Sequence, residues 1–234
     1  FNQIIRVRNS TTSQVAASAE VWVRQGRSIS DTNDLIKTST VLSKVGFMDS
    51  ATSAQLLTSS INGYGIAAKD AMSVVDKMSA IDVNAATSTE DLAVAMAQTA
   101  SGAKIAGVSM DELLSYVATI SDVTQASGDT IGVSLKTMFA RINSVKLGSL
   151  TDDEGQDISR VETVLKQYGI TLRETNGTAK DTGDILDELS TKWGSLTGLE
   201  KSEIAMQMAG VHQKEKFLGK KRSIRSLLIL NFSF

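Results

Sequence analysis

The sequence predicts a mostly α-helical protein, an array of antiparallel helical hairpins followed by a small α+β unit with a short β-hairpin. Proline is absent from all 234 residues, so no residue without a backbone N–H interrupts a helix. Apolar residues recur at intervals of three and four, the spacing of one helix face. Ser, Thr or Asp precedes many of these segments and Gly follows several of them, as helix caps do.

Four apolar stripes predict helices in the first third of the chain. The segments are 18–26, 31–46, 50–65 and 67–81, and the first three end at or near a glycine. Trp22 lies on the first stripe and is expected to be a core or interface residue. Ser60 lies between stripes, so we expect it to tolerate a charged side chain.

Three further helices follow at 88–107, 108–123 and 132–145. The first is rich in small residues, which suits close contact between helices. The second begins with Ser109 and Glu112, which have the spacing of a capping box. We predict that the stripes of the second and third helices pack in the core or against partners; their members are Leu113, Leu114, Val117, Leu135, Met138, Phe139 and Ile142.

Arg141 lies beside the stripe of the third of these helices. We therefore expect it to support packing or interaction rather than catalysis. Its guanidinium is predicted to be partly exposed and to pair with an acid on a neighbouring helix, or to cap the C-terminus of another helix. The loss of such an exposed pair would cost roughly 0–1 kcal/mol.

A faint internal repeat relates residues 45–78 to residues 106–138. Each segment has a glycine, a cap, a helix, a glycine-bearing loop and a second helix. This layout predicts two related hairpins that stack. We accordingly divide the chain into a helical hairpin repeat region at 1–148, a small α+β unit at 149–218 and an atypical basic and apolar tail at 219–234.

The small α+β unit is predicted from its caps and one turn. Thr151 and Glu154 have capping-box spacing and predict a helix over 151–169. Asn176-Gly177 is a dipeptide typical of a β-hairpin turn. Two more helices are expected at 183–196 and 197–211, the second capped by Thr197 and Glu200. The tail beyond this unit is interpreted as a surface anchor or a truncation artefact, and the start at Phe1 suggests a fragment.

The composition excludes most kinds of catalytic and metal-binding site. The formal net charge is −2, cysteine is absent and histidine occurs once, at His212. The loop at 63–68 fits a Gly-x-Gly-x-x-Ala pattern, but the segment before it is helical rather than a strand. The acids Asp152, Asp153, Glu154 and Asp157 lack calcium-loop spacing and are interpreted as helix-capping residues.

We therefore predict no catalytic residue, no cofactor, no metal site and no specific nucleic-acid site. No apolar run is long enough for a transmembrane helix, while contact with a membrane surface stays open. An assembly or scaffold protein that is not an enzyme is the expected class.

Three segments carry a resemblance to a known family. "LIKTSTVLSKVG", "DLAVAMAQTASGAKIAGVSMDELLSYVATISDVTQASGDTIGVSLKTMFARI" and "SEIAMQMAGVHQKEKF" resemble the core region of tail tape measure proteins of long-tailed bacteriophages and prophages. The likeness covers roughly 15–218 and is most specific over 88–142.

The resemblance implies a structural protein of the virion that lies in the tail tube lumen and sets tail length during assembly in the host cytoplasm. Such a protein is released ahead of the DNA. Tail tube subunits and tail assembly chaperones are the implied partners, together with self-association. The alternative is a helical signalling or secreted-effector scaffold domain of a bacterium. Extended single helices and a compact array both fit the stripes.

Overall fold

The computed structural model describes residues 12–152, 155 and 157–218. The prediction of a mostly α-helical protein is confirmed, because the described residues form ten α-helices and one short 3₁₀ helix and contain no assigned strand. The elements are α2 (Thr12–Arg24), α3 (Ile29–Val45), α4 (Ser50–Tyr64), η1 (Ala68–Asp70), α5 (Ala71–Asn84), α6 (Thr89–Ile105), α7 (Met110–Thr124), α8 (Gly128–Lys146), α9 (Val161–Gln167), α10 (Thr182–Trp193) and α11 (Gly198–Leu218).

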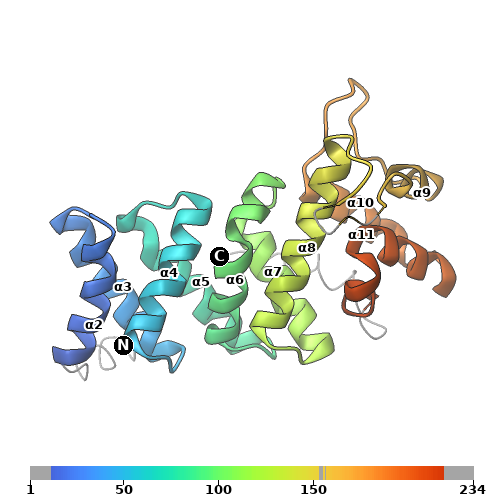
Figure 1. Ribbon diagram of the computed structural model, residues 1–234. Helices are drawn as coiled ribbons and strands as arrows, with labels where there is room; N and C mark the ends of the chain where they lie inside the picture. The colour runs from blue at the N-terminus through green and yellow to red at the C-terminus, as the bar shows by residue number, and fades with distance from the viewer. Residues whose placement is uncertain (1–11, 153–154, 156, 219–234) are drawn as a thin grey trace.

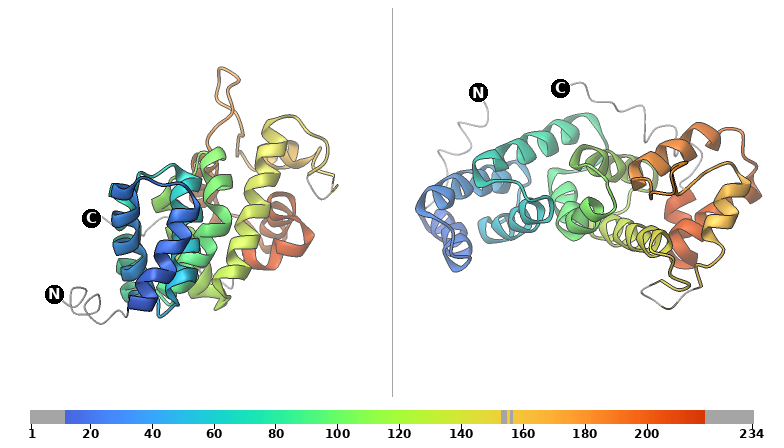
Figure 2. Two further views of the ribbon diagram at one scale, coloured as in Figure 1. Left: turned by 60° about the vertical axis from the view of Figure 1, so that its left-hand side comes forward. Right: turned by 90° about the horizontal axis from the view of Figure 1, so that it is seen from above.

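The helices from α2 to α8 form a two-layer array (Figure 1). The first layer contains α2, α4, α6 and α8, each packed against the next, and the second layer contains α3, α5 and α7 (Figure 2). Successive helices alternate between the layers, so the chain forms hairpins that stack side by side. The array is compact, and the helices do not continue into one another as extended rods.

The helices of the first layer run parallel to one another. At their C-terminal ends, Lys104 of α6 donates a hydrogen bond of 2.7 Å to the carbonyl oxygen of Tyr64 in α4. Lys146 of α8 lies 3.4 Å from the carbonyl oxygen of Ala106, directly after α6. At the opposite edge, the N–H of Gly128 in α8 donates to Asp91 of α6 over 2.6 Å. Equivalent ends of neighbouring helices therefore meet at the same edge of the array.

The array has a repeat of 39 residues. The helices α4, α6 and α8 begin at Ser50, Thr89 and Gly128, which are 39 residues apart, and the same interval separates the starts of α5 and α7. Core positions follow this spacing: one fully buried set is Trp22, Ile61, Ala100 and Phe139, and another is Leu35, Val74 and Leu113. The core therefore repeats with the helices.

The repeat predicted from 45–78 and 106–138 has the wrong phase. It aligns α4 with α7, which lie in different layers, and α5 with α8. A cap followed by an apolar stripe starts helices in both layers. That short pattern alone therefore does not distinguish one layer from the other.

Small residues let the first layer pack closely. A Cβ atom added to Gly63 of α4 would lie 2.5 Å from the Cβ of Ala100 in α6. A Cβ added to Gly128 would overlap the backbone of Asp91. Neither contact leaves room for a larger side chain, because cores respond even to single methylene groups.

Several buried hydroxyl groups donate hydrogen bonds within their own helices. Ser39, Thr99 and Ser134 each donate a bond of 2.7 Å to the carbonyl four residues earlier. Ser60 does the same to Leu56 over 2.9 Å and is only 1% exposed. The expectation that Ser60 lies on a tolerant surface is therefore wrong, because α4 contacts α2, α3 and α6 and so buries a wide arc.

The segment after α8 contains less regular structure than predicted. The helix expected over 151–169 is limited to α9, and Thr151 instead forms an isolated antiparallel bridge with Asp157. Around Asn176-Gly177 the chain turns back on itself with a single bridge, Arg173 to Ala179, and no strand. The predicted β-hairpin of the α+β unit is therefore wrong. The arms of the turn bury only Leu172, and an isolated two-stranded hairpin is only marginally stable.

The last two predicted helices are found as α10 and α11, although α11 continues to Leu218, beyond the predicted end at 211. The N–H of Thr197 donates to Glu200 over 2.6 Å and the N–H of Glu200 to the Thr197 hydroxyl over 3.4 Å, which is the expected capping box. One hydrophobic cluster runs from Trp22 to Met208, so α9–α11 share a core with the array. The predicted tail at 219–234 lies outside the described residues. Within 12–152, 155 and 157–218, no helix is long and apolar enough to cross a membrane.

Candidate functional site

Arg141 lies where the array meets the C-terminal helices, and it is 6% exposed. Its Nε donates a 2.7 Å hydrogen bond to the carbonyl oxygen of Gln207 in α11. One terminal nitrogen forms an ion pair with Asp152, and the other lies 3.4 Å from the carbonyl oxygen of Asp157. A single guanidinium therefore joins α8, the connection that follows it and α11.

This geometry corrects the sequence expectation for Arg141. The side chain is buried rather than partly exposed, because α11 packs against the flank of α8 that carries it. Its acid is Asp152, which lies in the connection after α8 and not on a neighbouring helix. Both charged side chains are almost fully removed from solvent, so the pair is a structural element of the core.

The 39-residue repeat gives Arg141 a specific place. Counting back by one and two repeats leads to Gly102 in α6 and Gly63 in α4. Gly63 is the residue that lets the next first-layer helix approach closely. α8 carries arginine at this position, and its flank meets α11 instead of another repeat. Arg141 therefore marks the point where the repeat ends.

The structure places the predicted stripe residues in the core. They form part of one hydrophobic cluster and do not converge on a ligand cavity. On α7 they are Leu113, Leu114 and Val117, and on α8 they are Leu135, Met138, Phe139 and Ile142.

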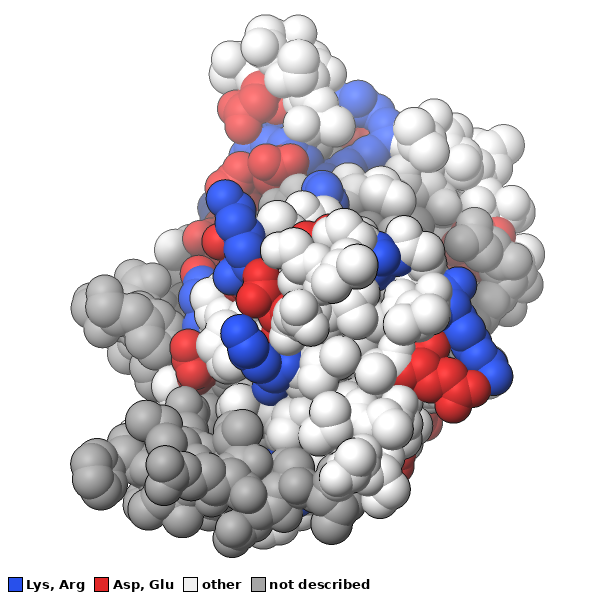
Figure 3. Space-filling view, turned by 90° about the vertical axis from the view of Figure 1, so that its left-hand side faces the viewer, with Lys and Arg blue, Asp and Glu red and all other residues white. Residues whose placement is uncertain are grey.

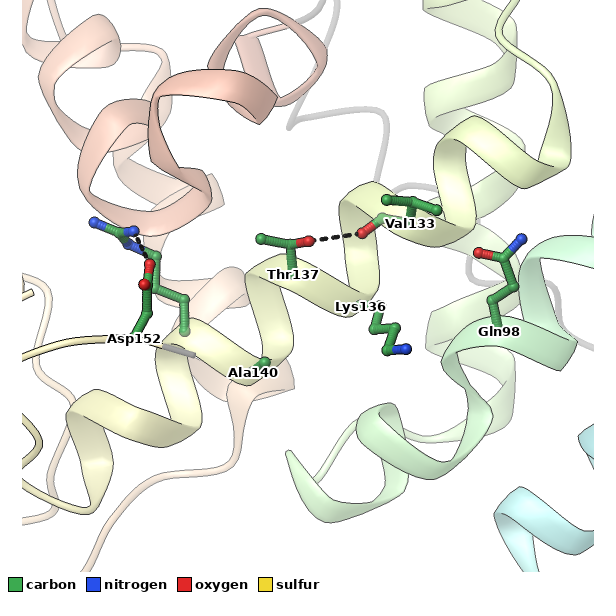
Figure 4. Close-up of a pocket in the computed structure, with 7 residues that line it drawn as sticks. Gln98, Val133, Lys136, Thr137, Ala140 and Asp152 are labelled. Atoms are coloured by element: carbon green, nitrogen blue, oxygen red, sulfur yellow. Dashed lines mark hydrogen bonds and ion pairs between the residues drawn. The ribbon is translucent and has the colours of Figure 1, made fainter. Parts of the chain in front are cut away.

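A pocket of about 300 Å³ lies beside Arg141 on the first layer (Figure 4). Its lining residues come from α6, α8 and the connection after α8: Gln98, Val133, Lys136, Thr137, Ala140, Arg141 and Asp152. The amide of Gln98 donates to Asp129 over 2.5 Å, and the Thr137 hydroxyl donates to the carbonyl of Val133 over 3.0 Å. Because these groups and the ion pair already have partners, the pocket offers no pair of groups poised for acid–base chemistry among the described residues.

A second polar junction holds α10 to the array. Lys146 donates to the hydroxyl of Thr182 over 2.9 Å, and the N–H of Thr182 donates to the carbonyl of Ala106 over 2.8 Å. Arg173 donates to the carbonyl of Lys146 over 3.0 Å. Burial lowers the pKa of Lys146, while the carboxylates of Asp181 and Asp184 oppose that shift. This junction positions α10 through backbone carbonyls at the ends of α6 and α8.

Acidic residues gather between α7 and α10. Desolvation raises the pKa of Asp187, and the charges of Glu112 and Asp184 raise it further. Burial likewise raises the pKa of the Tyr116 hydroxyl. Among the residues that the structure describes, no group of three or more His, Cys, Asp or Glu side chains has an arrangement that could hold a metal ion.

The other candidate residues do not form a site. Asp152 pairs with Arg141, and Asp157 accepts a 2.8 Å bond from the N–H of Ser159, while Asp153 and Glu154 lie outside the described residues. The Gly-x-Gly-x-x-Ala loop begins inside α4, and no strand precedes it. The side chain of His212 is not among those described.

Sequence reasoning missed the polar partners at both junctions. Asp152 had been interpreted as a cap, and Gln207, Lys146 and Thr182 carried no signal at all. The 39-residue spacing would have helped, because an arginine at the position of two glycines stands out once the repeat is known.

The fold and the two junctions define a helical repeat scaffold, a class that presents extended surfaces rather than catalytic pockets. The chain matches the family described as phage-related minor tail protein over residues 2–210, and it belongs to that family. It is therefore a component of a phage tail, and so of the virion, in a family of structural proteins. This agrees with the tape measure resemblance. No solved structure matches the chain.

Proposed function

We propose that the chain is part of a tail tape measure protein, which sets tail length during assembly and is released ahead of the DNA. The observation that carries the proposal is the family match over 2–210 together with the likeness of 88–142 to the tape measure core. The repeat array supports a structural role, since its regular 39-residue spacing serves the packing of the core.

The proposal places the protein in the tail tube lumen in the virion and in the host cytoplasm during assembly. Its partners would be tail tube subunits and tail assembly chaperones, with self-association between copies. No specific nucleic-acid site is proposed. Nothing in the structure favours the alternative of a bacterial signalling or effector scaffold.

The test is disruption of the gene in a phage that encodes this chain. Electron micrographs are expected to show particles with absent tails or tails of irregular length, and complementation with the intact gene should restore uniform tails. Uniform tails of normal length in the disrupted phage would overturn the proposal. Crosslinking of the tail tube subunits to the chain in assembling particles tests the proposed partner.

A further inference from the structure

We infer that the array of residues 12–146 stays folded in the assembled tail and does not add to tail length as an extended helix. The inference rests on the proposed function and concerns how much this array contributes to tail length. In an extended helix each residue advances the chain by about 1.5 Å, so 39 residues would span roughly 58 Å. In the array, helices lie side by side about 8–10 Å apart, so one repeat adds only about 10 Å.

The ends of the helices are fixed by strong local signals. Five helices are preceded by an N-cap residue whose side chain accepts a hydrogen bond from the backbone N–H three residues later, and these residues are Ser28, Asp49, Ser88, Ser109 and Ser127. The connections also contain residues with positive φ, namely Gly26, Phe47, Gly65, Gly107 and Gln125. An extended helix would have to convert every one of these caps and turns into helix.

Burial in the array is also too wide for a single extended helix to reproduce. α6 buries Leu92, Ala93, Ala95, Met96, Thr99, Ala100 and Ala103. These residues cover a broad arc because α4, α7 and α8 surround the helix. A coiled-coil seam covers a narrower stripe, so an extended helix would leave part of this surface exposed to water.

Crosslinking within the virion tests the inference. The 234 residues contain no cysteine, so introduced thiols are the only ones within this sequence. The side chains of Gln98 and Asp129 meet between α6 and α8 at 2.5 Å, although they are 31 residues apart in sequence. In one continuous helix the same residues would be roughly 46 Å apart. The variant with Gln98→Cys and Asp129→Cys, treated with a short bis-maleimide, should therefore crosslink internally in purified protein and in intact tails.

A matched pair controls for nonspecific reaction. Phe47→Cys and Leu147→Cys introduce exposed thiols at opposite edges of the array, and this pair should not crosslink in either sample. Crosslinking of the 98/129 pair in purified protein but not in tails would overturn the inference, because it would show that the array opens on assembly. Absence of the 98/129 crosslink in both samples would also overturn the inference, because it would show that α6 and α8 do not pack against each other.

A repeat deletion provides an independent measurement. Removing residues 50–88 takes out one 39-residue repeat and leaves Asp49 to cap α6 in place of Ser88. Small-angle scattering of the purified chain should show a maximum dimension shorter by about 10 Å. Tails assembled with this variant should keep their length to within about the same amount. A shortening of roughly 58 Å in either measurement would overturn the inference.

The outcome separates this inference from the proposed function. If the chain is absent from purified tails and gene disruption leaves tails uniform, the proposed function fails. If disruption abolishes uniform tails while the deletion shortens them by roughly 58 Å, the proposed function holds and only the inference fails. Removal of residues 50–67 alone is the off-register control, since it deletes α4 without α5 and should unfold the array.

Discussion

The Nε of Arg141 donates a 2.7 Å hydrogen bond to the carbonyl oxygen of Gln207, which lies in the interior of α11. The bond links the last helix of the array to the C-terminal helices. With Asp152 on its other side, Arg141 is a buried charge whose partners come from two segments that are distant in sequence.

Arg141→Met should destabilise the chain by about 3–5 kcal/mol, because it removes the guanidinium that forms a buried ion pair with Asp152. Denaturant unfolding followed by circular dichroism measures the effect. Arg24→Ala is the control, since its pair with Glu20 is exposed and should contribute less than about 1 kcal/mol. Equal losses for the two variants would show that the buried pair has no special role. Adding Asp152→Leu to Arg141→Met should recover much of the loss.

Gly63→Ala and Gly102→Ala should change the free energy of unfolding in opposite directions, although the two positions are equivalent in the repeat. The new methyl group at 63 meets Ala100 at 2.5 Å and should cost about 1–3 kcal/mol. At 102 nothing lies within 4 Å, so alanine should stabilise α6 by up to about 1 kcal/mol. Thermal melts of the two variants give the comparison, and a stabilising Gly63→Ala would disprove the close approach of α4 and α6.

Ser60→Asp should unfold or strongly destabilise the array, whereas the adjacent Ser59→Asp should change the free energy of unfolding by no more than about 0.5 kcal/mol. Ser60 is buried on α4, and its neighbour is exposed. Circular dichroism melts of both variants measure the difference. A tolerant Ser60→Asp would contradict the wide burial of α4.

Asp187→Asn should make the protein more stable at neutral pH but not in acid. The folded state raises the pKa of Asp187 above its usual value of 3.8, so it binds this proton more tightly than the unfolded chain does. The contribution of Asp187 to folding stability therefore falls as the pH rises from 3.8 through its raised pKa. Above that window the carboxylate is charged in the folded protein, which disfavours the folded state. Since Asp187 is exposed, the gain should not exceed about 0.5 kcal/mol. Melting temperatures between pH 4 and pH 7 test this, and a pH-independent difference between variant and parent would refute it.

The sequence was informative where signals are local. The capping boxes at Ser109 and Thr197 are formed as predicted, because each needs only residues within one helical turn. The apolar stripes located every helix of the array for the same reason. The helix predicted from Thr151 failed, since a cap spacing alone does not say whether the following residues have a surface to pack against.

The candidate site is formed by contacts between residues that lie far apart in the sequence. Arg141 and Gln207 are 66 residues apart, and no local pattern connects them. The burial of Ser60 likewise follows from three neighbouring helices rather than from its own. The phase of the repeat was missed because the helices of the two layers share the same short caps, and only the spacing of the core residues distinguishes them.

The parallel first layer has an electrostatic consequence. Backbone dipoles of parallel helices add, so the partial negative charge of their C-terminal ends accumulates along one edge. Lys104 bonds the carbonyl of Tyr64 at the end of α4, and Lys146 lies beside that of Ala106 at the end of α6. The macrodipoles of α4 and α6 are thus each compensated by a cation from the next first-layer helix, which couples neighbouring repeats. We therefore expect the array to melt as one cooperative unit, and salt to weaken that cooperativity before it weakens the apolar core.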